Sequence, residues 1–230
     1  MKIGIIGAMP EEVKMLLEDL TDRQEHEQAG FVLFEGSLEH VPVMIAQCGV
    51  GKVNAAVLTQ LLIQRGATHI IFTGVAGAVA ANLQVGDIVV SQDAVQHDVD
   101  VTALGHASGE IPGDALRWEA DDTLRALAHA AASNLDEVSA YVGTIATGDQ
   151  FIADNDKKAW LLETFGAACA EMEGASVAHV CCKWDIPFVI IRSISDDSDG
   201  SAEVDFRVFM PQAAERASSV VRSMLQGLAG

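Results

Sequence analysis

Apolar runs alternate with segments of helical period along most of the chain. A short apolar run between glycine or polar residues predicts a buried strand, and apolar positions three and four residues apart predict a helix. Strands are predicted at residues 3–9, 31–38, 41–48, 68–73, 87–91, 138–146, 168–173 and 187–193. Helices are predicted at residues 10–20, 52–65, 121–133, 155–165, 175–184 and 206–228.

This order of elements predicts an α/β protein, a three-layer sandwich of helices around a mixed, mostly parallel twisted sheet. Residues 31–38 and 41–48 are expected to pair antiparallel, whereas strands that alternate with helices favour parallel pairing. No internal repeat, low-complexity tract or linker interrupts the pattern, and 230 residues suffice for one packed core. We therefore expect a single domain spanning residues 1–230.

Two carboxylates, Glu171 and Glu173, stand where an apolar strand gives way to a helix. If both belong to the strand they point to the same face, because side chains alternate along a strand. An acidic side chain between two apolar elements costs free energy unless a partner offsets it. The pair therefore indicates a site.

Three acids are predicted to meet at the carboxyl edge of the sheet, where open α/β sheets bind ligands. Glu12 follows the first predicted strand, Glu173 ends the strand at 168–173, and Asp196 follows the last strand. Two of them have ordinary alternatives: Glu12 would suit the dipole at a helix start, and Asp196 would suit a cap in an acidic loop. The three together favour a site.

Charge and motifs narrow the function. A net charge of −19 disfavours nucleic acid and anionic membranes as partners. No apolar run reaches the ~18 residues that span a bilayer, and the first strand has the wrong flanks for a secretion signal, so a cytoplasmic protein is expected. The segment 49–54 lacks a complete dinucleotide fingerprint or P-loop, and neither GxSxG nor HExxH occurs. With no signal for a metal or a cofactor, the paired carboxylates favour acid/base hydrolysis of a largely neutral small molecule.

A series of segments, in order along nearly the whole chain, resembles the bacterial 5′-methylthioadenosine/S-adenosylhomocysteine nucleosidases. The segments are MKIGIIGAMPEE from residue 1, GVGKVNAA from 49, VGDIVVS from 85, HDVDVTA from 97, TGDQFI from 147, EMEGA from 171 and RSISD from 192. Each one alone is a loose match, whereas the ordered set is specific.

The resemblance implies a purine-nucleoside-phosphorylase-like fold, a homodimer, and hydrolysis of the bond between adenine and ribose. By position, Glu12 would activate the attacking water and Arg192 would help to hold it. Asp196 would act as general acid at adenine N7, and Glu173 would hold the ribose hydroxyls. Glu171 is expected to support the site from behind.

The remaining contacts implied by the resemblance surround the base and the 5′ end of the nucleoside. Phe151 would stack on adenine, and the Ile152 backbone would hydrogen-bond its edge. Val101 and Leu104 would reach the 5′ end from the neighbouring subunit. Further substrate-lining positions are Met9, Val50, Val75, Met172, Ser195 and Phe206.

Two departures from the family pattern concern the surroundings of these residues. Val75 and Ala78 stand where many relatives carry Ser and Gly, so a hydroxyl near Glu12 is missing. Leu104 stands where an aromatic residue is common, so the contact from the partner subunit is expected to be weaker.

Three alternatives stay open on the sequence. A nucleoside phosphorylase would need several cationic or N–H donors for phosphate, and Arg192 is the one basic side chain among the motif residues proposed to act. Aminodeoxyfutalosine is a possible substrate because it differs mainly at the 5′ end. A non-catalytic nucleoside-binding module would not need the full set of acids.

Overall fold

The predicted apolar runs become the strands of one mixed sheet. The computed structural model describes residues 1–136, 138–196 and 202–229, and the side chains within 1–136, 138–196 and 208–228. Its strands are β1 (Ile3–Gly7), β2 (Thr21–Gln28), β3 (Phe31–Leu38), β4 (Val41–Gln47), β5 (His69–Ala78), β6 (Ile88–Gln96), β7 (Trp118–Glu119), β8 (Ala140–Thr147), β9 (Ala167–Glu171) and β10 (Phe188–Asp196). Its helices are α1 (Pro10–Glu18), α2 (Lys52–Gln64), α3 (Asp122–Ser133), α4 (Asn155–Phe165), α5 (Gly174–Lys183) and α6 (Ala202–Ala229), with a 3₁₀ turn at Thr102–Leu104.

Parallel pairing holds within two groups of strands, β4-β1-β5-β10 and β6-β8-β9. Antiparallel ladders join the groups, β10 with β6 and β5 with β9, so that β5, β10, β6, β8 and β9 close into a ring of pairings. An antiparallel meander, β4-β3-β2, extends the other edge. The ring brings the carboxyl ends of β5, β9 and β10 together, and the acids predicted for the site follow or end strands at this edge.

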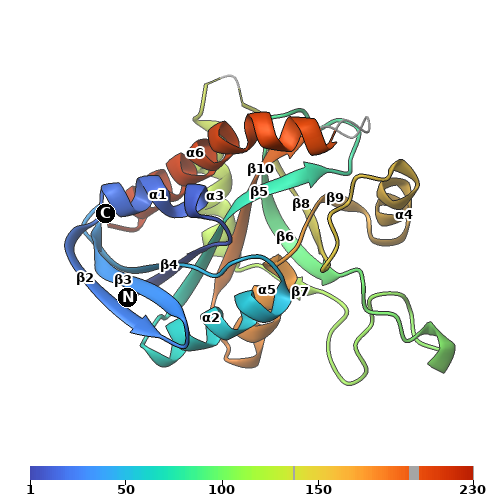
Figure 1. Cartoon of the computed structure of the whole chain (residues 1–230), viewed down its shortest axis with the longest axis horizontal. Helices are drawn as coiled ribbons and strands as arrows, with labels where there is room; N and C mark the ends of the chain where they lie inside the picture. The colour runs from blue at the N-terminus through green and yellow to red at the C-terminus, as the bar shows by residue number, and fades with distance from the viewer. Residues whose placement is uncertain (137, 197–201, 230) are drawn as a thin grey trace.

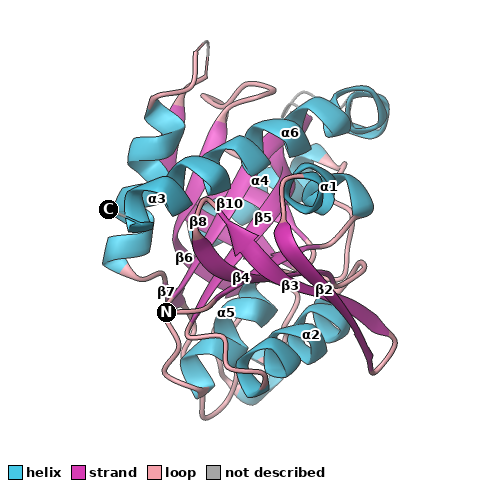
Figure 2. Cartoon of the chain, turned by 90° about the vertical axis from the view of Figure 1, so that its left-hand side faces the viewer, coloured by secondary structure: helices cyan, strands magenta, loops and turns pink. Residues whose placement is uncertain are grey.

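Helices cover both faces of the sheet, as the three-layer prediction requires (Figures 1 and 2). On one face α1, α3 and α6 pack over Ile3 and Ile5, and on the other α2 and α5 pack over Ile6. Alternate residues of β1 thus enter different cores, which explains why this strand is apolar throughout. Helix α4 packs against β8 and β9 at the end of the sheet.

Strand β2 was not predicted, because its sequence TDRQEHEQ has no apolar alternation. It lies at the exposed edge of the sheet, where β3 is its one partner among the described strands, and it buries almost none of its side chains. Such a strand is held by backbone hydrogen bonds to its neighbour, and its own sequence carries little signal. Strands β5 and β6 also extend past their predicted ends at residues 73 and 91, since β9 and β8 provide partners for the added residues.

The prediction that Glu171 and Glu173 share a strand is wrong. Strand β9 ends at Glu171, and Glu173 is the N-cap residue of α5, with φ −138° and ψ −38°. The local reason is that the Glu171 carboxylate accepts hydrogen bonds from the N–H groups of Glu173 and Gly174. These bonds turn the chain from the strand into the helix. The alternation of a strand therefore does not apply to Glu173.

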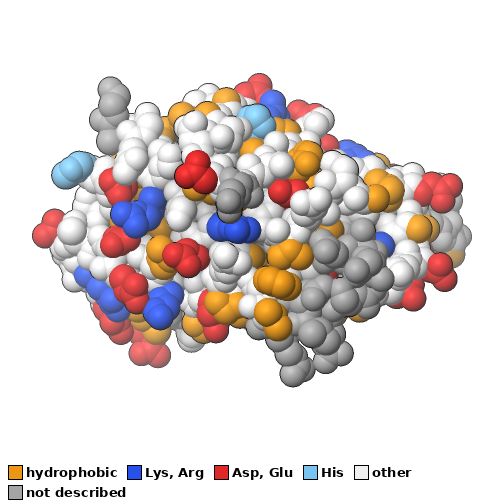
Figure 3. All heavy atoms as spheres, turned by 90° about the horizontal axis from the view of Figure 1, so that it is seen from above, with side chains coloured by type: hydrophobic (Ala, Val, Ile, Leu, Met, Phe, Trp, Pro, Cys, Tyr) orange, Lys and Arg blue, Asp and Glu red, His pale blue; other side chains and the backbone are white. Residues whose placement is uncertain are grey.

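The charged side chains of the surface do not gather on the side that carries α1 and α6. Figure 3 shows acidic side chains there spread among basic and apolar ones. This agrees with a solubilising role of the net charge of −19. Among the described residues, no helix is both long and apolar enough to cross a membrane.

Candidate active site

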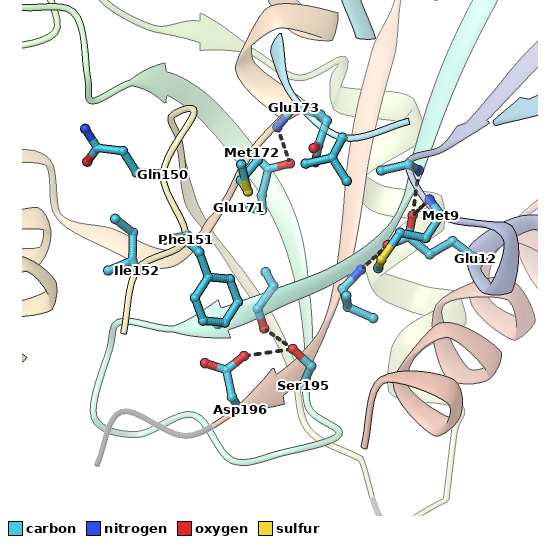
Figure 4. A pocket seen from close by; sticks show the side chains of 16 residues that line it. Met9, Glu12, Gln150, Phe151, Ile152, Glu171, Met172, Glu173, Ser195 and Asp196 are labelled. Carbon is cyan, nitrogen blue, oxygen red and sulfur yellow. Dashed lines mark hydrogen bonds between the residues drawn. The ribbon is translucent and has the colours of Figure 1, made fainter. Parts of the chain in front are cut away.

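A cavity of about 590 Å³, its open mouth included, lies at the carboxyl ends of β5, β9 and β10 (Figure 4). A concave site with apolar walls and a few polar groups suits a small-molecule ligand. Its lining includes the following predicted residues: Met9, Glu12, Val50, Val75, Phe151, Ile152, Glu171, Met172, Glu173, Ser195 and Asp196. The sequence reasoning missed Ala8, Ala76, Gly77, Gln150 and Ala170. These neighbours of predicted residues, mostly small, carry no chemical signal of their own.

Glu12 is a buried acid held by three backbone N–H groups. Its Oε2 accepts hydrogen bonds from Ala8 N at 2.6 Å and from Met9 N at 2.9 Å. The bond from Met9, the N-cap residue, also caps helix α1. Its Oε1 accepts from Val75 N at 3.0 Å, on a strand distant in sequence. Capping of a helix does not need this second anchor. Burial raises the pKa of Glu12, while Arg192 and the three N–H groups act in the opposite direction.

Arg192 lies behind the cavity wall and does not line it. Its Nη2 donates to Glu171 Oε2 at 2.5 Å, and its guanidinium stacks on Phe72 with 4.0 Å to the ring centroid. Glu171 also accepts from the Thr147 hydroxyl and from the start of α5. This set of partners offsets the cost of burying both charges. Both oxygens of Glu171 thus accept hydrogen bonds from groups of the protein.

Glu173 makes fewer contacts with the protein. Its Oε1 accepts from Gly51 N at 2.7 Å, at the start of α2. Gly51 has φ +100°, a region that favours glycine, so the tight loop that presents this N–H depends on it. Burial and the nearby Glu171 raise the pKa of Glu173 to about 8, although Gly51 N and Arg192 lower it. A carboxyl with one anchored oxygen on a cavity is suited to bind hydroxyl groups.

Asp196 enters the cavity because β10 is irregular at its end. The β10–β5 register shifts between Ile194 and Asp196, which leaves Ser195 as an extra residue. Such a bulge redirects side chains, so Ser195 and Asp196 both line the cavity although they are neighbours in the strand. Ser195 Oγ donates to Asp196 Oδ1 at 2.8 Å (Figure 4). On the other side a Cβ at Gly77 would lie 2.8 Å from Oδ2, so the close approach requires glycine.

The loop between β8 and α4, which carries Phe151 and Ile152, is anchored to the start of α2. Asp149 N donates to Asp98 Oδ2 at 2.9 Å, and Lys52 N donates to Asp149 Oδ1 at 2.9 Å. The Lys52 ammonium in turn donates to Asp98 Oδ1 at 2.7 Å, so Lys52, Asp98 and Asp149 form a closed set of hydrogen bonds. Phe151 is 52% exposed and stands at the mouth of the cavity, where a bound ring would cover it.

The four carboxylates share the cavity with an apolar wall. Figure 4 places Phe151 and Asp196 on one side, Met9 and Glu12 on the other, and Met172 with Glu173 at one end. Val75 contributes its side chain to the wall and its N–H to Glu12, a bond that any residue except proline would make there. The departure at Val75 therefore leaves the anchoring of Glu12 intact.

Besides Arg192, the predicted residues Val101 and Leu104 do not line this cavity in the described part of the chain. Val101 and Leu104 lie in the loop after β6, and Leu104 is 75% exposed. The side chain of Phe206 lies outside the described residues.

Comparisons with known proteins identify the family of this chain. A family model described as the phosphorylase superfamily matches residues 2–226. The 5′-methylthioadenosine/S-adenosylhomocysteine nucleosidase of an Exiguobacterium species is 41% identical over 230 residues, with 99% of each chain covered.

Solved structures give the same result. The 5′-methylthioadenosine/S-adenosylhomocysteine nucleosidase of Colwellia psychrerythraea, in complex with adenine, has a TM-score of 0.94 and 40% identity, covering 98% of this chain and 94% of that one. The futalosine hydrolase of Helicobacter pylori has a TM-score of 0.93 and 36% identity, covering 98% and 97%. The chain therefore belongs to the phosphorylase superfamily and, within it, to the 5′-methylthioadenosine/S-adenosylhomocysteine nucleosidases.

Proposed function

We propose that this protein hydrolyses the N-glycosidic bond of 5′-methylthioadenosine and S-adenosylhomocysteine, releasing adenine and the 5′-thioribose product. The observation that carries the proposal is the meeting of Glu12, Glu173 and Asp196 in one cavity with apolar walls. The names of the relatives support the same substrates.

The arrangement suits departure of adenine through a cationic ribosyl transition state. Asp196 gives its proton to N7 of adenine as the bond between C1′ and N9 breaks, and the bonding electrons stay with the base as neutral adenine. Glu12 takes a proton from water, whose oxygen joins C1′. The positive charge that develops on the ribosyl ring is stabilised by the nearby carboxylates in a site largely shielded from water.

The substrate's other parts match the remaining walls. Two vicinal ribose hydroxyls fit a single carboxylate, which supports Glu173 as the group that binds them, with Met172 beneath the sugar. Phe151 stacks on the adenine ring, and the Ile152 backbone meets the edge of the base. Met9 and Val50 offer a soft apolar surface to the thioether.

Water is favoured over phosphate as the nucleophile. A phosphate ion needs several cationic or N–H donors. Here the N–H groups of Ala8, Met9 and Val75 already donate hydrogen bonds to Glu12. The Nη2 of Arg192 donates to Glu171. The carboxylate of Glu12 would repel an anion at this place.

A side-by-side assay tests the function. Purified protein is given methylthioadenosine, S-adenosylhomocysteine, 5′-deoxyadenosine or aminodeoxyfutalosine, with and without added phosphate, and free base release is measured. We expect adenine from the first two at the same rate in both conditions. Release that depends on phosphate would establish phosphorolysis instead, and preference for aminodeoxyfutalosine would reassign the substrate.

Binding of methylthioadenosine is expected to strengthen as the pH rises through about 8. The raised pKa of Glu173 means that the group is protonated below this pH and ionised above it. The ionised form accepts from both ribose hydroxyls. The measurement is calorimetric titration from pH 6 to 9 on Asp196→Asn protein, which is expected to turn the ligand over too slowly to consume it.

Addition of Glu173→Gln to that protein is the matched comparison, since Glu12 stays unchanged in both. The Gln side chain is expected to weaken binding at pH 9 about tenfold, the lower end of what hydrogen bonds to a charged group are worth. It should also remove the rise with pH. An affinity that is independent of pH in the Asp196→Asn protein would contradict the assignment of Glu173.

We also propose that two copies of this chain form a homodimer in which each lines the 5′ end of the other's cavity. Val50, Val53 and Val57 leave an exposed apolar stripe at the start of α2, beside the cavity. The loop after β6 projects from the body of the molecule and carries the exposed Leu104 (Figure 1). Analytical ultracentrifugation at assay concentration is expected to give the mass of two chains, and a monomer would refute the arrangement.

A further inference from the structure

A buried lysine stands next to the carboxylate assigned as general acid. Lys158 Nζ lies 4.0 Å from Asp196 Oδ2, and both side chains are less than 5% exposed. The mechanism above does not use Lys158, and none of the segments that carry the family resemblance contains it. A buried cation costs free energy unless an anion offsets it, so its placement calls for a reason.

Helix α4 explains how the lysine reaches this place. The Asp154 side chain caps α4 by accepting from Lys157 N at 2.8 Å, and Lys158 N bonds Asp154 O at 3.0 Å. The helix then packs Leu161 and Phe165 into an apolar cluster at this end of the sheet. Lys158 lies on the same inward side of the helix, since it precedes Leu161 by three residues.

Lys157 takes the opposite environment. It is only partly buried, and its ammonium lies 3.7 Å from the ring centroid of Trp160. Of these two adjacent lysines on one helix, only Lys158 has a contact with Asp196 among the described residues, and the two also differ in burial. The chain itself provides a matched control.

We propose that Lys158 is a positioning residue for the general acid, whose ammonium stabilises the carboxylate that Asp196 becomes when its proton passes to the adenine. The inference rests on the proposed function, because it needs Asp196 as proton donor. Proton transfer leaves a negative charge in a buried place, and a cation at 4.0 Å offsets that charge. Lys158 therefore makes Asp196 a stronger acid than burial alone would allow.

Two other described groups close to Asp196 do not supply this charge. Ser195 Oγ on the same strand is neutral and bonds Oδ1. Cys169 on β9 interacts electrostatically with Asp196, and burial raises the pKa of its thiol so that it stays neutral. Asp197 and Asp199 lie outside the described residues and stay unchanged in every variant compared below.

The test is the pH profile of adenine release from methylthioadenosine by wild type, Lys158→Met and Lys157→Met. Loss of the cation raises the pKa of Asp196, so the acid keeps its proton to higher pH. The alkaline limb of kcat/KM is expected to move upward by about one pH unit in Lys158→Met. Its kcat is expected to fall roughly three- to tenfold, because a weaker acid transfers its proton less readily. Lys157→Met is expected to match wild type in both.

Two further variants keep the outcome decisive. Lys158→Gln repeats the test with a polar neutral side chain if Lys158→Met does not fold, as judged by thermal unfolding. In the Asp196→Asn background, Lys158→Met should cause no additional loss of kcat, because the group it acts on is gone. A fall in kcat with an unmoved alkaline limb, or an equal loss in both backgrounds, would overturn the inference. Full activity of Asp196→Asn itself would instead refute the proposed acid.

Discussion

Replacement of Asp196 by Asn is expected to lower the rate of adenine release by about 10³-fold or more, within the range that general acid catalysis contributes. Adenine is a poor leaving group unless N7 receives a proton, and an amide has none to give at neutral pH. The shape of the residue is kept, and the bond from Ser195 Oγ remains possible at the amide oxygen. The measurement is single-turnover adenine release from methylthioadenosine.

Asp156→Asn is the control for this change. Asp156 is exposed in the first turn of α4, the helix that carries Lys158, and does not line the cavity. It should leave the rate unchanged. If the Asp196→Asn protein binds methylthioadenosine but turns over at the wild-type rate, another group protonates the base.

Glu12→Gln is the second change with a large expected effect, a loss of about 10²- to 10⁴-fold in kcat. The amide cannot take a proton from the attacking water. It also places an NH₂ group among the N–H donors of Ala8, Met9 and Val75, where the carboxylate had accepted. Because substrate contacts are assigned to other residues, KM should change less than kcat.

The neighbouring Glu11 gives the control for this prediction. Glu11 lies in the same first turn of α1, so it shares the helix dipole, yet it is exposed to solvent. Glu11→Gln should keep wild-type kinetics. Equal losses in Glu11→Gln and Glu12→Gln would mean that the acids serve the helix, the alternative that the sequence left open for Glu12.

The buried part of the fold was predictable, because in an α/β protein an apolar run is buried either as a strand of the sheet or as the face of a helix packed against it. Strands β1 and β10 and the helices between them follow from their own residues. Strand β2 was missed, since its exposed sequence is ordered by hydrogen bonds to β3 rather than by burial. The ring of pairings that joins β5, β9 and β10 could not be predicted either, because pairing between strands distant in sequence leaves no pattern in neighbouring residues.

The candidate site shows the same division. The sequence pointed to Glu12, Glu173 and Asp196, because acids beside apolar strands are costly and stand out. The groups that surround these acids could not be predicted from the neighbouring sequence. The bulge at Ser195, the turn from Glu171 into α5, and the approach of Lys158 to Asp196 all depend on partners far along the chain.

The sequence by itself determined the fold class, the order of the buried elements, and the acids that face one edge of the sheet, because burial and period act on neighbouring residues. Only the tertiary structure decided how those acids differ. Glu171 forms an ion pair with Arg192, burial and Glu171 raise the pKa of Glu173 to about 8, and Asp196 faces a buried lysine. The reason is physical: proton affinity in a buried site is governed by charges and N–H groups within a few ångströms, and folding brings these from distant parts of the chain.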